Sequence, residues 1–257
     1  MNSTPQVYGI LLALLFAVAA GLVGSFALMK RMLLASDVIS HVALPGLGLA
    51  FLFGFNPLLG GGATLLLGTL LIWHLQRTTG LATEAMIGVV FAGSLAVGAA
   101  LTPEEDLVEA LFGRFQPLSL FSFLLGAAAV LLIIFVIFRF KEQLVLSMFS
   151  PELAAATSVR LDRLNLYFLM MFSLTVLVGL RFMGALLAGA LIIIPATTGR
   201  RLASDVSHFL LSSCAVSAAA VALGFVITSY LPRFSLGPVV VIVSVIFFAL
   251  SLLKKPA

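Results

Sequence analysis

The sequence predicts an all-α integral membrane protein with eight or nine transmembrane helices. Of its 257 residues, 62% are hydrophobic and only 9% are charged, whereas soluble domains carry about a quarter charged residues. Apolar runs recur along the whole chain, and each is long enough to cross roughly 30 Å of hydrocarbon. The period-two alternation of a membrane β-barrel is absent, so the spans are helices.

Nine candidate spans follow one another, and they account for almost the whole chain. The fourth, sixth and seventh are short, so eight spans are also possible. No soluble domain, low-complexity tract or internal repeat is found, and residues 1–257 are therefore expected to form a single transmembrane domain. The nine ranges are 7–29, 33–55, 57–76, 84–101, 120–138, 164–180, 183–199, 207–230 and 236–253.

The order of the charges predicts the topology. No basic residue precedes the first apolar run, whereas Lys30 and Arg31 follow it. A cleavable signal peptide has the opposite order, so this run is expected to be a retained span with its N-terminus outside. With nine alternating spans the C-terminus is cytoplasmic, and only Arg114, Arg181 and Arg233 of the 14 Lys and Arg residues face outward. This asymmetry is typical of multi-pass proteins that obey the positive-inside rule.

Several function classes are excluded by what the sequence lacks. The net charge of +4 does not indicate nucleic-acid binding, because the basic residues stand singly or in pairs at span ends and form no stripe. The phosphate-binding pattern G-x-x-x-x-G-K-[ST] is missing, as are H-E-x-x-H and G-x-S-x-G. The chain is therefore not expected to be an enzyme or to hydrolyse ATP itself. The lone Cys214 is read as a small packed hydrophobic residue.

Asp37 and His41 are the first candidate site. They are four residues apart, which places them on one face of a helix. A carboxylate within a membrane costs roughly 2.5–3.5 kcal/mol, so it normally faces a protein interior or an aqueous path. Carboxylate and imidazole are also ligands of first-row divalent metals. The alternative is that Ser36 or Asp37 caps the helix while His41 bonds a neighbouring backbone group, and the spacing alone leaves both interpretations open.

Two prolines predict breaks in the helices that would line a pathway. Pro45 has no N–H to bond the carbonyl of His41, and non-helical backbone at membrane depth usually lines protein or a wet cavity. Gly46 beside it favours close helix contact. Pro195 would free the carbonyl of Leu191 in the same way, although a kinked packing helix is the simpler explanation of that region.

Two hydrophilic segments are long enough to contact partners. The inner one contains Ser150, Pro151 and Glu152, which form a good helix start because they supply a capping hydroxyl, a proline and a first-turn carboxylate. A short surface helix to about Thr157 is expected there, either as a connector or as a docking element. The outer segment, 102–119, is acidic in its first half and reads most simply as a solvated loop.

Five stretches together resemble a known family. They are RMLLASDVISHVALPGLGLAF, ALFGRF, SPELA, FMGALLAGALIIIPATTGRR and GPVVVIVSVIFFALSLLKK, and they occur in this order between residues 31 and 255. With them the sequence resembles the membrane permeases of ATP-binding-cassette importers for zinc, manganese and iron, particularly the zinc-uptake permeases of bacteria. The first and fourth stretches are the specific ones.

The resemblance implies a type II importer-like permease in the bacterial cytoplasmic (inner) membrane. It further implies a homodimer with a second permease copy, two cytoplasmic ATP-binding subunits and an extracytoplasmic metal-binding protein. Asp37 and His41 would line the translocation path, and Glu105 and Arg114 would lie where the binding protein docks. The residues expected to couple to the ATPase are Ser150, Pro151, Glu152, Leu153, Ala154 and Ser158, the last standing where the family commonly has glycine.

The resemblance implies no covalently bound cofactor, and Zn(II) is the expected cargo. Two copies of Asp37 and His41 around one dimer axis would give four nitrogen and oxygen ligands, which suit tetrahedral Zn(II) better than Mn(II). Manganese and iron stay as alternatives. A stand-alone ion-coupled carrier is the competing class, but it predicts inverted repeats and several intramembrane ionisable residues, which the sequence does not show.

Overall fold

The computed structural model describes residues 4–33, 35–101, 118–156, 160–231 and 233–253, and within these ranges the regular structure is entirely helical. This confirms the all-α prediction. The helices are α1 (Thr4–Met29), α2 (Ala35–His41), α3 (Leu44–Phe53), α4 (Pro57–Thr79), α5 (Thr83–Leu101), α7 (Leu120–Phe149), α8 (Pro151–Ala156), α9 (Leu161–Met183), α10 (Ala185–Leu202), α11 (Val206–Tyr230) and α12 (Leu236–Ser251).

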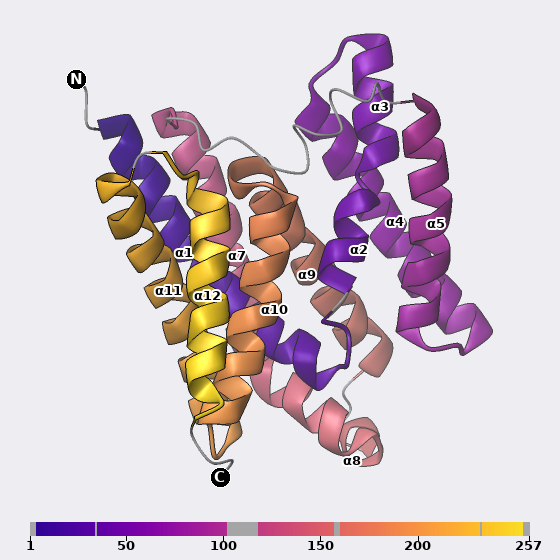
Figure 1. Ribbon diagram of the computed structural model, residues 1–257. Coiled ribbons are helices and arrows are strands. Elements are labelled where there is room, and N and C mark those ends of the chain that lie inside the picture. Colours follow the sequence, from indigo (N-terminus) through magenta and orange to yellow (C-terminus); the bar gives the residue numbers. More distant parts are fainter. Residues whose placement is uncertain (1–3, 34, 102–117, 157–159, 232, 254–257) are drawn as a thin grey trace.

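Each of the nine expected spans has a helical counterpart among the described residues. Seven segments are long and apolar enough to cross a membrane, and one of them, Ala35–Phe53, consists of α2 and α3 together. The 18 residues of α10 and the 16 of α12 occupy the two remaining ranges. Successive long helices run back and forth, so the start of α1 and the end of α12 lie at opposite ends of the bundle (Figure 1).

The helices form two groups. In the larger one, α1 is the central element and packs against α7, α9, α10 and α11. Phe16 and Phe26 of α1, and Phe168 and Phe172 of α9, are fully buried in its core. The smaller group, α2 to α5, stands beside it (Figure 1) and is joined mainly through α9, which contacts α2 and α4. At that junction the hydroxyls of Thr69 and Ser173 share a buried hydrogen bond of 2.6 Å.

The predicted break near Pro45 is present. Helix α2 ends at His41, α3 begins at Leu44, and Pro45 lies in the first turn of α3. Between the two helices the backbone tightens, because Val42 N–H bonds the carbonyl of Ile39 at 3.0 Å, three residues back rather than four. The backbone therefore changes course directly after His41, as the missing N–H of proline requires.

The predicted break at Pro195 is wrong, since α10 continues through it from Ala185 to Leu202. The hydroxyl of Thr197 donates to the carbonyl of Ile194 at 2.8 Å, and that of Thr198 donates to the same carbonyl at 2.8 Å. Helix α10 is also enclosed by α1, α11 and α12. The carbonyl that Pro195 frees is that of Leu191, so these hydroxyls do not replace the lost hydrogen bond, and the packing of neighbouring helices allows this membrane helix to tolerate proline.

Helices α3 and α4 cross in direct backbone contact at two glycines. A Cβ atom added to Gly46 would overlap the carbonyl of Gly60, and one added to Gly60 would overlap the carbonyl of Gly46. The hydroxyl of Thr64 also donates across the crossing to the carbonyl of Ala43 at 3.3 Å. Gly46 therefore lies within α3 as a close-contact residue, and its role beside the break is to let two backbones touch.

Replacing Gly60 by alanine is expected to destabilise the protein by about 1–3 kcal/mol, because the two backbones must separate to admit the methyl group. The matched control is Gly93→Ala on α5, where an added Cβ meets no atom within 4 Å. The control should be neutral or slightly stabilising, since alanine favours helix over glycine. Thermal unfolding of the purified protein, followed by the fluorescence of its single tryptophan, measures both. Equal midpoints for the two variants would contradict the close crossing.

Candidate functional site

Asp37 and His41 both belong to α2 and lie one turn apart, as expected. Asp37 is exposed in the first turn, and His41 is partly buried at the last residue of the helix. The hydroxyl of Ser36 donates to the carbonyl of Leu33 at 2.9 Å. Among the described residues, no backbone amide donates to Ser36 or Asp37 side chains, and the Asp37 carboxylate has no ion-pair partner. The cap expected of Ser36 or Asp37 is therefore not what the described part of the chain shows, whereas the other half of that alternative, a bond from His41 to a neighbouring backbone group, is confirmed.

The ring of His41 is held by its own helix. Its Nδ1 lies 2.9 Å from the carbonyl oxygen of Asp37, and the Ser40 hydroxyl donates to the same carbonyl at 2.6 Å. A carbonyl only accepts, so of the two neutral tautomers this contact fits the one with its proton on Nδ1. Nε2 then keeps a lone pair, which is the arrangement found in metal-binding histidines. Phe91 of α5 supports the ring edge-on, with 5.6 Å between centroids.

One chain offers an incomplete ligand set. Within the described residues, no group of three or more His, Cys, Asp or Glu side chains could hold a metal ion. Asp37 and His41 supply one carboxylate and one imidazole nitrogen, whereas a tetrahedral Zn(II) site needs four donors. We call this pair the Asp37–His41 half-site, because the described residues bring together only two of those four donors here.

The predicted surface helix after Ser150 is confirmed. Ser150 ends α7, and its carbonyl accepts from Ala154 N–H at 3.0 Å in the first turn of α8. Glu152 is exposed, Leu153 is 59% exposed and Ala154 is buried. The helix ends at Ala156, and Ser158 lies outside the described residues. Helix α8 thus presents a carboxylate and an apolar side chain outward, with Pro151 at its first position.

The two residues expected at the outer docking surface, Glu105 and Arg114, belong to the segment 102–117, which lies outside the described residues. Their assignment stays a prediction.

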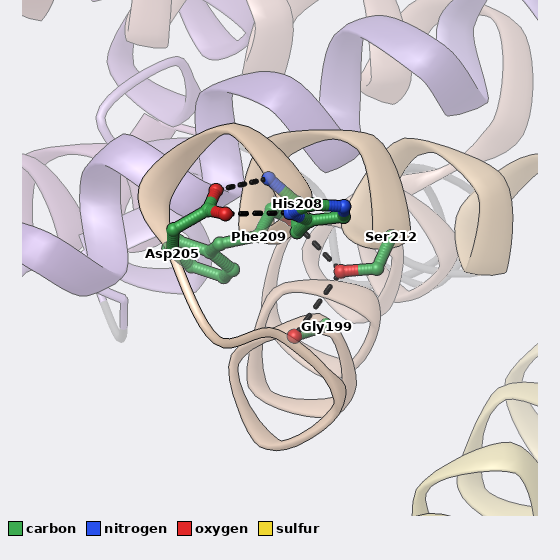
Figure 2. Close-up of polar contacts among 5 residues, drawn as sticks. All are labelled: Gly199, Asp205, His208, Phe209 and Ser212. Carbon is green, nitrogen blue, oxygen red and sulfur yellow. Dashed lines mark hydrogen bonds and ion pairs between the residues drawn. The ribbon is translucent and has the colours of Figure 1, made fainter. Parts of the chain in front are cut away.

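Sequence analysis did not find the contact between Asp205 and His208 (Figure 2). Asp205 caps α11 by accepting from His208 N–H at 2.8 Å, and its second oxygen lies 2.6 Å from His208 Nδ1. The backbone hydrogen bond from His208, with the ring contact second, lowers the pKa of the Asp205 carboxyl. The available signal was an aspartate three residues before a histidine at a helix start. Both side chains are exposed, and the pair serves as a helix cap.

A polar cluster joins three helix ends. The ammonium of Lys30, just after α1, donates to Asn165 Oδ1 at 2.9 Å, and Asn165 Nδ2 donates to Gln76 Oε1 at 2.7 Å. The ammonium also lies 5.1 Å from the centroid of the Phe168 ring. None of these contacts carries a negative charge, and burial lowers the pKa of Lys30 to about 8.

The folded protein is expected to gain stability as the pH rises through this range. Between the folded pKa of Lys30, about 8, and its ordinary value of 10.5, the unfolded chain binds more protons than the folded protein. The gain from Lys30 is up to about 3 kcal/mol, and Lys30→Met should remove it. Thermal midpoints measured from about pH 7 to about pH 10.5 test this. Lys141→Met is the control, and a Lys30→Met profile parallel to that control would refute the assignment.

The described residues include seven segments long and apolar enough to cross a membrane, which define a multi-pass membrane protein. A family model places it further: the ABC 3 transport family matches residues 6–255. The chain belongs to this family.

Named relatives cover nearly the full length. The manganese import system permease protein ScaB of Streptococcus parasanguinis is 30% identical over 251 residues, covering 95% of this chain and 88% of the relative. The high-affinity zinc uptake system membrane protein ZnuB of Haemophilus influenzae is 27% identical over 253 residues, covering 96% and 95%. The solved PsaBC structure from Streptococcus pneumoniae, in complex with Fab, matches with a TM-score of 0.80 at 25% identity. The match covers 96% of this chain and 90% of the chain in that structure.

A second solved structure has the same fold. An inward-facing ABC transporter of the metal-chelate type has a TM-score of 0.74 at 19% identity, covering 99% of this chain and 89% of its own.

Proposed function

We propose that this chain is the membrane permease subunit of an ATP-driven importer of divalent metal ions, with Zn(II) as the transported ion. Membership of the ABC 3 transport family supports the importer class, and relatives named for manganese import and zinc uptake support a divalent metal as cargo. The observation that carries the proposal is the Asp37–His41 half-site, with an unpartnered carboxylate among the described residues and a free ring nitrogen next to a helix break.

The half-site requires a second copy of the permease to become a path. Two copies facing each other across a dimer axis would bring two carboxylates and two imidazoles around one channel. Four donors of this kind suit tetrahedral Zn(II). Water completes the coordination while the ion moves, because a transport site must release its ion as well as bind it.

Manganese is the second candidate. Permeases named for manganese import are 29% and 30% identical to this chain and two proteins named for manganese transport are 25% identical, while two ZnuB proteins are 27% and 26% identical, so the identities alone do not separate the two metals. Mn(II) prefers six mostly oxygen ligands, whereas the half-site supplies one nitrogen for each carboxylate. The donor chemistry therefore decides our choice of zinc, and transport measurements with both ions separate the two.

The remaining machinery belongs to other chains. We infer that two cytoplasmic ATP-binding subunits hydrolyse ATP and dock on α8, whose exposed Glu152 and Leu153 are suited to contact a partner. An extracytoplasmic metal-binding protein would deliver the ion near Glu105 and Arg114. The chain would lie in the bacterial inner membrane, with its N-terminus outside and its C-terminus in the cytoplasm.

Asp37→Asn and His41→Ala should each abolish most metal uptake while the protein still accumulates and retains its ATP-binding subunits. Asparagine keeps the shape of Asp37 but removes the charge that attracts a divalent ion, and alanine removes the ring nitrogen while remaining a good helix former. Uptake of zinc and of manganese into vesicles that contain the complete importer measures the effect and identifies the cargo.

The matched controls are Asp205→Asn and His208→Ala, which alter an exposed aspartate and histidine in a helix cap. These two variants should transport at the wild-type rate. Wild-type uptake by both Asp37→Asn and His41→Ala would remove the half-site from the path. Uptake of manganese with no uptake of zinc would overturn the choice of cargo and leave the importer class intact.

Glu152→Lys should weaken association with the ATP-binding subunits without unfolding the permease, because it reverses an exposed charge in the first turn of α8. Glu84→Lys is the control, since Glu84 is an exposed carboxylate in the first turn of α5. Co-purification of the ATP-binding subunit with each variant tests the assignment. A normal yield with Glu152→Lys would exclude Glu152 from the contact.

A further inference from the structure

Two adjoining pockets open where α4 ends and α9 begins. Their volumes are about 780 and 560 Å³, and both are lined by Trp73, Arg77, Leu161 and Asp162. The first extends along α9 to Tyr167, and the second reaches inward to Lys30. We call the two together the α4–α9 pocket. Neither Asp37 nor His41 lines this pocket, so it is distinct from the half-site.

Positive charge dominates the α4–α9 pocket. Arg77, Arg160 and Arg163 are exposed around it, and the ammonium of Lys30 lies at its inner side. Among the described residues that line it, the only carboxylate is that of Asp162, which is 3.7 Å from Arg77 Nε, with both side chains more than half exposed. One exposed carboxylate does not balance four cations, so the pocket is suited to an anion.

Aromatic residues place the pocket at the level of lipid headgroups. Trp73 Nε1 donates to the carbonyl of Asp162 at 3.0 Å, and the guanidinium of Arg77 lies 5.7 Å from the centroid of the Trp73 ring. Tyr167 is 44% exposed and stacks on Phe140 of α7, with 5.4 Å between centroids. Tryptophan and tyrosine at the ends of spans mark the membrane–water interface.

An exposed apolar side chain, that of Leu70, lies on the same face of α4 as two residues of the pocket. Leu70 lies three residues before Trp73 and seven before Arg77, so the three share one face of α4, and Leu70 is exposed. On the facing helix, Leu166 lines the pocket beside Tyr167. A ligand held by the arginines can therefore extend an apolar chain along α4 and cover Leu70. A free anion, or the acidic side chain of a protein partner, would leave Leu70 uncovered.

We propose that the α4–α9 pocket binds the phosphate headgroup of an anionic phospholipid, with its acyl chain lying along Leu70. Guanidinium groups pair with phosphate oxygens through two parallel hydrogen bonds, and basic pockets between membrane helices recognise anionic headgroups. The phosphate would lie between Arg77 of α4 and Arg163 of α9. Because Lys30 lies at the inner side with only neutral polar partners, the same headgroup offers it the negative charge that it lacks.

Lipid binding to the purified permease, measured by native mass spectrometry, tests the proposal. The probes are phosphatidylglycerol and phosphatidylcholine with identical acyl chains. The wild type should prefer phosphatidylglycerol, and the double variant Arg77→Gln/Arg163→Gln should bind it about 30-fold more weakly, the loss that two cation contacts at an anionic surface imply. Its affinity for phosphatidylcholine should not change. Arg233→Gln, which removes an exposed arginine outside the pocket, is the control and should bind like the wild type.

A second variant is expected to strengthen lipid binding, which a folding defect could not do. Asp162→Asn removes the only carboxylate from the lining and should tighten phosphatidylglycerol binding about fivefold. Unchanged phosphatidylglycerol binding in both variants would overturn the proposal. So would displacement of the lipid by millimolar inorganic phosphate, which would make this a free-anion site. Loss of the ATP-binding subunit from the double variant with lipid binding intact would assign the pocket to a protein interface instead.

Discussion

The contact on which the candidate path depends is the close crossing of α3 and α4 at Gly46 and Gly60. A membrane interior offers no water to satisfy a broken helix, so the break before Pro45 must be held by protein. The Thr64 hydroxyl donates to the carbonyl of Ala43 within the break, and Gly98 of α5 admits Leu44 and Pro45 from the other side. With α3 fixed between α4 and α5, the end of α2 that carries His41 has one defined position.

The packing also links the proposed coupling helix to the half-site. Helix α8 contacts α7 and α9, and α9 contacts both α2 and α4. Helix α9 thus neighbours two elements: the surface where an ATP-binding subunit would dock, and α2, which carries Asp37. The polar cluster of Lys30, Asn165 and Gln76 ties the first turns of α9 to α1 and α4. Contiguous contacts of this kind are the physical route by which two such sites can be coupled.

The sequence predicted those features that depend on local chemistry. Hydropathy located the helices, Pro45 located the break, and Ser150 to Glu152 located α8, because each signal lies within a few neighbouring residues. Pro195 has the same missing N–H as Pro45, but α1, α11 and α12 enclose its helix, and no local pattern shows that. The α4–α9 pocket was missed for a related reason. Lys30, Arg77 and Arg163 are far apart in the sequence, and only the tertiary fold brings them to one pocket.

An incomplete site in one chain fits the work proposed for it. A chain that enclosed a metal ion with four ligands of its own would bind it too firmly to pass it on, because conduction needs binding that is strong enough for the ion to enter and weak enough for it to leave. The proposed half-site would avoid this, since its exposed carboxylate and its Nε2 would complete a shell only while a second copy faced them. A change in the angle between two copies would then separate the donors and release the ion. On this argument the position of α2 relative to α2 of the second copy would set the affinity for the metal ion. Because α3 is packed firmly on α4, a movement of these helices would change the coordination of the ion.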